Sequence, residues 1–475
     1  MDTNTLIDIV HEVQGQLWVD KVNETYRTGH LCQWVSTFHP DKLPCQLDGT
    51  FHRGALNAGM KIVFTDNTAW MVRFSCVGMN SDDHTDEKVA MEVTALNLIR
   101  NSTTIPVPRF HAWGPAASNS LGLGPFIIMD FVDGVSLEEI LRDPNAECPT
   151  RVMREDISDD DIEVIYRQMA NFLLQLFKLD FDYIGNLPNP EDHGPTPARP
   201  LTFKAHCITT TKWGVDTFGD RAQGFATTTE YFQYVVWQDL EQLVQQPNST
   251  VGFYDAGNKY VAFKALKFKL ICDDLGLANL IVRSKKDLTI VKAVDLEWSY
   301  VGPTQLFGSA PWWLLQDRPV NSTWDYDDND KPPKIAARYF RCLEVFMCVL
   351  QEEEAKMQEY QERELSNLVK WSQDSGTMWF HMLISSGFND QRSFPFTQLR
   401  QHIGEDEWVR QEKEFDNMEV EGFAARKVSE LNKYDEALEK LEESKSLVDS
   451  GDITREEFVS NALKESRIIS PVPRI

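Results

Sequence analysis

The chain has 475 residues, of which 42% are hydrophobic and 11% aromatic, so it can bury cores for two or three domains and is not intrinsically disordered. Its formal net charge of −26 argues against a large nucleic-acid-binding surface, because phosphate backbones bind to a basic face. The acidic balance is compatible with a cationic small substrate, although acidic surfaces are common among soluble proteins of any function.

The cysteine pattern and the lengths of the apolar runs indicate which kinds of site and which cellular location to expect. The eight cysteines are scattered, with no C-x-x-C pair and no His cluster beside them, so neither a zinc site nor a disulfide framework is expected. Residues 1–18 contain no basic leader before an apolar run, and the longest apolar runs, such as FIIMDFV, are too short to cross a bilayer. We therefore expect a soluble cytoplasmic protein that does not enter membranes.

Residues 1–47 predict a helical extension, because apolar residues recur there at helical spacing, at Leu6, Ile9, Val10, Val13 and Leu17. Residues 59–64 and 69–74 then predict a β-hairpin around the turn TDNT. A helix is expected at about 85–100, ended by the two prolines of IPVPRF, and FHAWG and FIIMDFV predict two more strands. Hairpin, helix and two strands in this order are typical of the small lobe of a kinase-type fold, which we assign to residues 48–133.

Residues 134–403 predict a larger, mostly helical lobe. SLEEIL begins one helix, and Ser158 can cap a second helix that has an acidic first turn and a continuous apolar stripe. Residues 279–282 and 288–294 predict an embedded hairpin. The tail, 404–475, is highly charged and predicts solvated helices. The predicted fold class is therefore α+β, a bilobed protein-kinase-like fold with a helical C-terminal extension.

The chemistry concentrates in ICDDLGLANLIV and in the VDLEW that follows. Asp274 and Asn279 are five positions apart, and Asp295 ends the next predicted strand. Phosphoryl transfer from ATP uses such a set: one acid orients and deprotonates a hydroxyl, and an amide and a second acid hold magnesium against the phosphates. An acid that ends an apolar strand is costly unless it is paired or bound to a metal. We predict Asp274 as the base, and Asn279 and Asp295 as Mg²⁺ ligands.

Other interpretations of these residues exist. A D-x-x-x-x-N match alone is common, and a solvated turn at Asp274 or a carboxylate cap at Asp295 would give the same letters. The apolar segments before and after the pair, together with the second acid, favour phosphoryl transfer. Asp273 competes with Asp274, but the spacing to Asn279 favours Asp274. Glu297 is a further acid that can face the same site as an extra ligand.

The first lobe supplies the predicted nucleotide contacts. Arg73, at the end of AWMVRF, takes the place of the phosphate-contacting cation, with Lys61 as the rival and a solvent-facing arginine as the alternative. Glu92 on the following helix either pairs with Arg73 or is one of several surface acids. Gly54 and Asn57, in RGALNAG, either bring backbone amides to the phosphates or form an ordinary turn.

MDFVDG stands at the end of an apolar strand, where a hinge would hydrogen-bond adenine. We expect Met129, Asp130, Phe131 and Val132 to border the nucleotide there, with backbone atoms making the contacts.

Aromatic residues and histidines have weaker signals. PWW at 311–313 can line a substrate pocket, but aromatic residues at such spacing are more often core, which is our prediction. The histidines, among them His381, show no ligand spacing, so we expect satisfied surface or core histidines.

Taken together, these segments resemble the aminoglycoside phosphotransferase-like, choline-kinase-related superfamily, in the form seen in fungal proteins. The matching segments run in family order over about residues 48–385, from RGALNAGMKIVF and WMVRF to ICDDLGLANLIV and VDLEWSYVGPTQLFGSAPWWLL. The resemblance implies a bilobed kinase-like fold with ATP and magnesium between the lobes, and the catalytic and phosphate-contacting roles given above. The chain departs from many kinases in having Cys272 in place of His, Arg73 in place of Lys, and few glycines in its phosphate loop.

The acceptor is not fixed by the motif, since fold and motif do not determine substrate. An acidic pocket wall in 150–165 or 317–330 would suit an amine-bearing alcohol. The predicted function is an ATP-dependent kinase acting on a small-molecule hydroxyl, and the alternative is a non-catalytic nucleotide- or partner-binding protein of the same fold. A protein kinase is disfavoured, because the chain lacks an H-R-D loop and S-A-P at 309–311 is followed by Trp rather than Glu.

Overall fold

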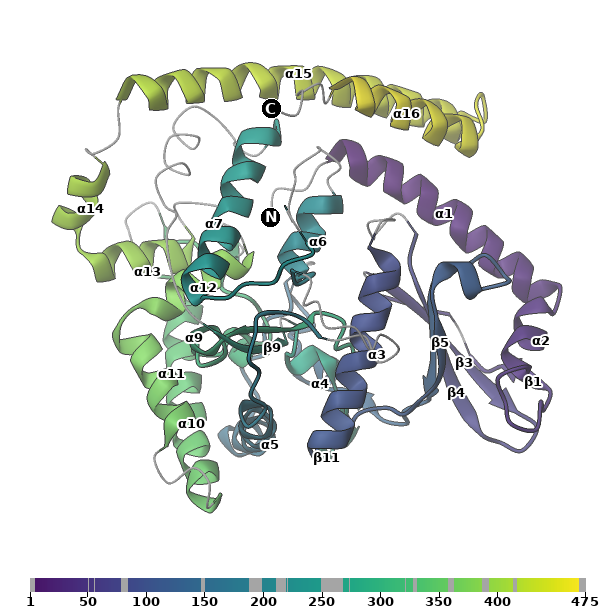
Figure 1. Cartoon of the computed structure of the whole chain (residues 1–475), viewed down its shortest axis with the longest axis horizontal. Helices are drawn as coiled ribbons and strands as arrows, with labels where there is room; N and C mark the ends of the chain where they lie inside the picture. Colours follow the sequence, from purple (N-terminus) through teal and green to yellow (C-terminus); the bar gives the residue numbers. More distant parts are fainter. Residues whose placement is uncertain are drawn as a thin grey trace.

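The computed structural model has two lobes, one built on an antiparallel sheet and a larger one that is mostly helical (Figure 1). It describes residues 5–469 except 50, 55, 78–83, 147–149, 188–198, 211–218, 220, 249–267, 273, 321, 328–330, 358–362, 387–392 and 413–416. The predicted α+β class, a small antiparallel sheet with a large helical part, is confirmed. Within the described residues, no helix has both the length and the apolar character that a bilayer crossing requires.

The first lobe contains a six-stranded sheet in the order β1–β3–β4–β6–β5, with β2 paired to β3. All of these pairings are antiparallel. The strands are β1 (Cys45–Leu47), β2 (His52–Arg53), β3 (Asn57–Phe64), β4 (Ala69–Ser75), β5 (Phe110–Gly114) and β6 (Phe126–Asp130). The predicted hairpin is β3–β4, and the two later strands are β5 and β6.

Helices cover both faces of this sheet. They are α1 (Thr5–Arg27), α2 (His30–Ser36) and α3 (Thr85–Ser102). Trp18 of α1 packs on one face, and its Nε1 donates to the carbonyl of Leu123 at 3.0 Å. Val89 and Val93 of α3 pack on the other face. The predicted N-terminal helix is therefore part of the sheet lobe.

Residue alternation along β4 decides which side chains reach the second lobe. Successive strand residues point to opposite faces of a sheet. Met71 packs with α3, whereas the buried residues of the α1 face are Trp70, Val72 and Phe74. Arg73, two positions after Met71, therefore faces α3. In the hairpin turn, Asn67 has φ = 69°, a left-handed conformation that asparagine adopts more readily than most residues.

The second lobe is built around the long helices α5 and α10. Its helices are α4 (Leu137–Leu141), α5 (Asp159–Phe177), α6 (Phe203–Thr210), α7 (Thr228–Gln245), α9 (Thr304–Phe307), α10 (Lys334–Lys356), α11 (Glu364–Asp374), α12 (Thr377–Ser386), α13 (Phe394–Ile403) and α14 (Glu405–Glu412). Tyr166 of α5 and Phe346 of α10 meet edge to face in the main core, with ring centroids 6.1 Å apart.

Two small sheets lie in this lobe. The predicted hairpin is β10 (Leu280–Ser284) with β11 (Asp287–Ala293), and β7 (Val135–Ser136) pairs with β10. A second sheet pairs β12 (Ser299–Pro303) with β8 (Gly185–Asn186) and β9 (Phe268–Cys272). We did not predict this second sheet, because strands of two to five residues that pair with distant segments leave no alternation to detect.

Ser158 caps α5 as predicted, since its Oγ accepts a hydrogen bond from the Asp161 N–H at 3.1 Å. We expect Ser158→Ala to lower the free energy of unfolding by about 1 kcal/mol, because one N–H of the first turn loses its acceptor. Urea unfolding followed by circular dichroism measures the change. Val164→Ala on the exposed side of the same helix is the control and should change stability by less than about 0.5 kcal/mol. Equal effects of the two substitutions would contradict the capping role.

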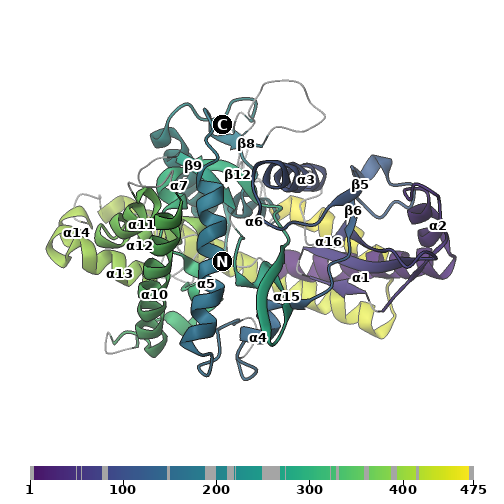
Figure 2. The same cartoon turned by 90° about the horizontal axis from the view of Figure 1, so that it is seen from below.

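The C-terminal helices form a strap that connects the lobes, composed of α15 (Asn417–Ser450) and α16 (Arg455–Ile469). Figure 1 shows α15 running above both lobes, and Figure 2 shows α1 beside α15 and α16. At the helical lobe, Phe423 of the strap packs with Leu243 of α7, and Lys427 Nζ donates to the carbonyl of Gln246 at 2.6 Å.

The other end of the strap packs on α1. The shared core contains Leu6, Val10 and Val13 of α1 with Tyr434, Leu441, Phe458 and Ala462 of the strap. Ion pairs from Lys445 to Glu12 at 2.8 Å and from Arg455 to Asp20 at 3.0 Å border it. The prediction of solvated tail helices is wrong for this face, because its apolar positions meet a partner from the opposite end of the chain.

Candidate active site

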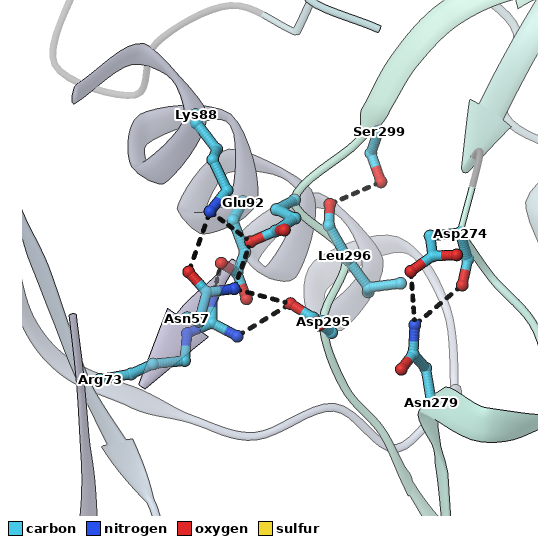
Figure 3. A network of polar contacts seen from close by, with 10 residues as sticks. Asn57, Arg73, Lys88, Glu92, Asp274, Asn279, Asp295, Leu296 and Ser299 are labelled. Atoms are coloured by element: carbon cyan, nitrogen blue, oxygen red, sulfur yellow. Dashed lines mark hydrogen bonds and ion pairs between the residues drawn. The ribbon is translucent and has the colours of Figure 1, made fainter. Parts of the chain in front are cut away.

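A short loop between β9 and β10 brings Asp274 and Asn279 together. The chain makes a 3-10 turn at Leu277–Asn279, and Asn279 Nδ2 donates to the backbone carbonyl of Asp274 at 2.9 Å and to its Oδ2 at 3.2 Å. In Figure 3 the amide oxygen of Asn279 lies on the side away from Asp274. The tight loop that the spacing predicts is therefore present.

Asp274 combines partial burial with a neighbouring cation. Arg318 Nη2 lies 3.9 Å from Oδ1 of Asp274, and 46% of the Asp274 side chain is exposed. Burial raises the pKa of Asp274 above the usual aspartate value, against the opposing effects of Arg318 and of the Asn279 hydrogen bond. A raised pKa makes an accessible carboxylate a stronger proton acceptor.

Asp295 follows β11 in an unusual backbone conformation. Its φ is 61°, in the left-handed region, which costs a residue with a Cβ about 1–3 kcal/mol. The surrounding contacts hold it there: Arg73 Nη1 lies 3.1 Å from Asp295 Oδ1, and the Val294 N–H donates to the Asn279 carbonyl at 3.0 Å. The second bond ties the strand of Asp295 to the loop of Asp274, so the two acids lie across one junction (Figure 3).

The predicted pair between Arg73 and Glu92 is present as an ion pair between Arg73 Nη2 and Glu92 Oε2. Glu92 is buried in α3. Because Arg73 also contacts Asp295, it links the sheet, α3 and the helical lobe. The rival cation, Lys61, pairs instead with Asp48 at 2.7 Å, away from this cluster.

A second buried ion pair, between Lys88 and Glu297, lies beside the first. The sequence predicted Glu297 at this site but not Lys88. Lys88 Nζ lies 3.0 Å from Glu297 Oε2 and donates to Asn57 Oδ1 at 2.9 Å. Asn57 Nδ2 donates to Glu297 Oε2 at 2.7 Å. Lys88 precedes Glu92 by four residues and so shares its helix face. One sequence signal could have identified Lys88: it lies on the apolar side of a predicted helix, one turn before an acid.

The charges of this cluster change the acidity of its carboxylates. Burial at the lobe junction and the charge of Glu297 raise the pKa of Asp295 to about 7, although Arg73 opposes the shift. Burial also opposes ionisation of Glu297, but Lys88 and Arg73 outweigh it and its pKa is lowered. Glu297 is therefore the ionised partner of Lys88, and Asp295 is the carboxylate that gains most from a further cation.

The oxygen atoms at this junction suit a hard divalent cation. Carboxylate oxygens of Glu92, Asp295 and Glu297 lie within 4.8 Å of one another. Glu92 is committed to Arg73, and Glu297 accepts bonds from Asn57 and Lys88. Asp295 is the acid in this group that remains half-buried, facing the loop of Asn279. Carboxylate and amide oxygens are the ligands that Mg²⁺ prefers, so the residues present fit this ion.

Most backbone N–H groups of the predicted hinge already donate to carbonyls of neighbouring segments. The N–H groups of Asp130 and Phe131 already donate to the carbonyls of Arg109 and Ala69, at 2.8 and 3.1 Å. Among the described residues, the N–H of Val132 has no acceptor. Of the expected hinge donors, Val132 is thus the one left for a ligand.

Three further predicted positions lie around this junction. Met129 is buried under α3, next to Val89, and borders the hinge from the sheet side. Gly54 closes a turn by donating to the Asn57 carbonyl at 2.8 Å, while the Asn57 side chain enters the charged cluster described above. After the hinge, Gly134 passes so close to β10 that a Cβ there would lie 2.7 Å from the Val282 carbonyl oxygen. This contact fixes the segment after β6 against the β10–β11 hairpin.

No model of a known protein family and no curated protein matches the chain. Among solved structures, the chain is similar to macrolide 2′-phosphotransferase type I, with 10% identity, a TM-score of 0.39 and coverage of 82% of this chain and 96% of that one. It is also similar to macrolide 2′-phosphotransferase MphH from Brachybacterium faecium, with 13% identity, a TM-score of 0.36 and coverage of 78% and 97%.

A third similar structure is amicoumacin kinase hAmiN in complex with AMP-PNP, Ca²⁺ and Ami, with 11% identity, a TM-score of 0.35 and coverage of 85% and 96%. By their names, all three are phosphotransferases or kinases. Their identities and TM-scores are low, so the assignment of the site rests on the side chains described above.

Proposed function

We propose that this protein is an ATP-dependent phosphotransferase that transfers the γ-phosphate to a hydroxyl group of a small molecule. The observation that carries the proposal is the meeting of the Asp274–Asn279 pair with Asp295, Arg73 and Glu92 at the junction of the lobes (Figure 3). The arrangement offers a proton acceptor, oxygen ligands for a divalent cation and a fixed positive charge. Phosphoryl transfer depends on these three groups.

The residues divide the work as follows. Asp274 accepts the proton of the acceptor hydroxyl as its oxygen attacks the γ-phosphorus, and ADP leaves with the electron pair of the broken P–O bond. Asn279 and Asp295 would hold Mg²⁺, which would neutralise phosphate charge. Arg73, oriented by Glu92, contacts the phosphates, and the Val132 N–H donates a hydrogen bond to the adenine.

Thermal unfolding with and without Mg-ATP tests nucleotide binding. A ligand that binds the native state at 100 times its Kd stabilises it by about 2.7 kcal/mol, so the wild type should melt at a higher temperature in Mg-ATP. Asp295→Asn should lose the metal-dependent part of this rise, because the amide cannot replace the charge of the carboxylate. A wild-type melting temperature that does not rise in Mg-ATP would contradict the proposal.

Mass spectrometry of metabolite extracts then tests turnover. We expect a new species heavier by one HPO₃ group that requires Mg-ATP and intact Asp274. Nucleotide binding without any such product would instead support the non-catalytic alternative of the same fold.

The raised pKa of Asp274 predicts an acid limb in the pH profile. A base works only when deprotonated, so kcat/KM should fall as pH falls through a pKa above the ordinary value of 3.8. Arg318 opposes that rise, so Arg318→Met should move the limb to higher pH. Initial rates at saturating Mg²⁺ across pH 4 to 9, roughly the range over which such a base titrates, measure both profiles. If the acid limb of kcat/KM lies at the same pH in Arg318→Met as in the wild type, a group other than Asp274 sets it.

A further inference from the structure

A cavity of about 120 Å³ lies next to the catalytic loop, inside the helical lobe. Leu275, the residue after Asp274, forms part of its wall, and Trp312 and Trp313 form another part. Trp312 packs so closely on the loop that a Cβ at Gly276 would lie 2.8 Å from its ring. Our prediction that PWW belongs to the core holds for the buried Trp313, but both tryptophans also line this cavity.

Two polar groups line the cavity without a hydrogen-bond partner among the described residues. His381 is 2% exposed and neither of its ring nitrogens is bonded, and Ser309 Oγ is also buried and unbonded. The prediction of satisfied histidines is therefore wrong for His381. Burial lowers the pKa of His381 to about 3, so its ring is neutral and offers one donor and one acceptor. Buried polar groups are normally bonded, and such exceptions call for a partner that is not part of the chain.

The described lining of the cavity does not supply the acidic wall that we considered for amines, and residues 328–330 of the second acidic stretch lie outside the described residues. Among the described residues no carboxylate lines it, and the charged side chain in that lining is Arg318, whose guanidinium lies 4.0 Å from the Trp312 ring. Arg318 Nη2 is also 3.9 Å from Asp274, so this arginine stands between the cavity and the base. In the acidic stretch 150–165, Asp159 instead pairs with Arg341 on the surface. A cation inside the cavity would therefore meet no carboxylate among its described lining residues.

We propose that this cavity is the acceptor subsite and that it takes an uncharged alcohol bearing an apolar ring with a neutral polar substituent, which hydrogen-bonds to His381. The inference rests on the proposed function, because the acceptor hydroxyl must reach Asp274. The volume supports it, since an apolar cavity of roughly 150 Å³ takes a benzene ring. The lining supports it as well, since aromatic side chains with few polar groups are typical of small-molecule sites.

Binding of p-cresol and toluene to the full chain tests this assignment without ATP or Mg²⁺. Relaxation-filtered ¹H NMR titration should show that the wild type binds p-cresol about tenfold more tightly than toluene, because a site with an unpaired polar group rejects the ligand that lacks the hydroxyl. His381→Phe keeps the ring shape and should abolish this preference while leaving toluene binding unchanged. His381→Gln, which keeps a neutral polar group, should retain part of the preference and serves if the first variant does not fold.

The outcomes separate this inference from the proposed function. No binding of either probe to the wild type, or an unchanged preference in His381→Phe, overturns the acceptor subsite even if Mg-ATP still stabilises the protein. Probe binding as expected without any Mg-ATP response overturns the proposed function and the acceptor role together. In the turnover assay, ADP should be released at least about tenfold faster with 2-(4-hydroxyphenyl)ethanol as the acceptor than with ethanolamine. The reverse order would overturn the predicted substrate class.

Discussion

Replacing Asp274 by asparagine is expected to lower the rate of phosphoryl transfer by about 10²- to 10⁴-fold, the usual contribution of a positioned general base. The substitution keeps the size of the side chain and its place beside Asn279 but removes its ability to accept a proton. Stabilisation by Mg-ATP should persist, because the proposed metal and phosphate contacts lie on Asn279, Asp295 and Arg73. Coupled ADP-release kinetics and thermal unfolding of the same preparation measure the two effects.

Asp287→Asn is the matched control for this experiment. Asp287 is a half-exposed carboxylate at the start of β11, paired with Arg283 at 2.5 Å, and it lies at the end of the hairpin away from Asn279. Its substitution should leave the rate within about twofold of the wild type, as for a surface change far from the site. Loss of activity in both variants, or in neither, would remove Asp274 from the role of base.

The largest effect on stability is expected from Asp239→Ala in the helical lobe. Asp239 Oδ2 lies 2.5 Å from Lys204 Nζ, and the two side chains are only 5% and 6% exposed. Lys204 also donates to the carbonyl of Ile384 at 3.0 Å. Removing one partner of a buried pair leaves the other charge without compensation, so the free energy of unfolding should fall by about 3–5 kcal/mol. Denaturant unfolding at neutral pH measures the loss.

Replacing both partners separates the penalty of the orphaned charge from the value of the pair. Lys204→Met combined with Asp239→Leu should recover most of the lost stability, because apolar side chains of similar volume fill the same space. The exposed pair Lys370–Asp374, at 3.1 Å, supplies the control, and Asp374→Ala should cost less than about 1 kcal/mol. A double variant as unstable as Asp239→Ala would mean that the hydrogen bonds of the pair dominate.

Local spacing was sufficient to predict the loop and the strands of the site. The four residues between Asp274 and Asn279 leave room for one tight turn, and the turn is present. The pairing of Arg73 with Glu92 followed from the order of strand and helix, and it is present too. The roles of these residues in catalysis remain predictions that the experiments above address.

The rest of the cluster depends on contacts between distant segments. Lys88 finds its partners in Asn57, which comes from the sheet lobe, and in Glu297, which lies in the turn between β11 and β12. No pattern in the sequence around Lys88 specifies either contact. The unbonded state of His381 is also a property of the packed lobe, since it depends on which groups fail to reach the ring. The periodicity of apolar residues predicts which side chains are buried, but it does not predict which buried polar groups lack a hydrogen-bond partner.

The strap gives the molecule a second connection between its lobes. The first is the covalent segment between Asp130 and Val135, and the second runs from α7 through α15 and α16 to α1. The lobes and their two connections thus form a closed ring. Two bodies with two hinges turn most easily about the axis through both hinges, so opening of the lobes, which would also break the junction contacts of Arg73 and Lys88, is confined to one rotation. Chain-end truncation would free the remaining directions of motion without touching a side chain at the junction of the lobes.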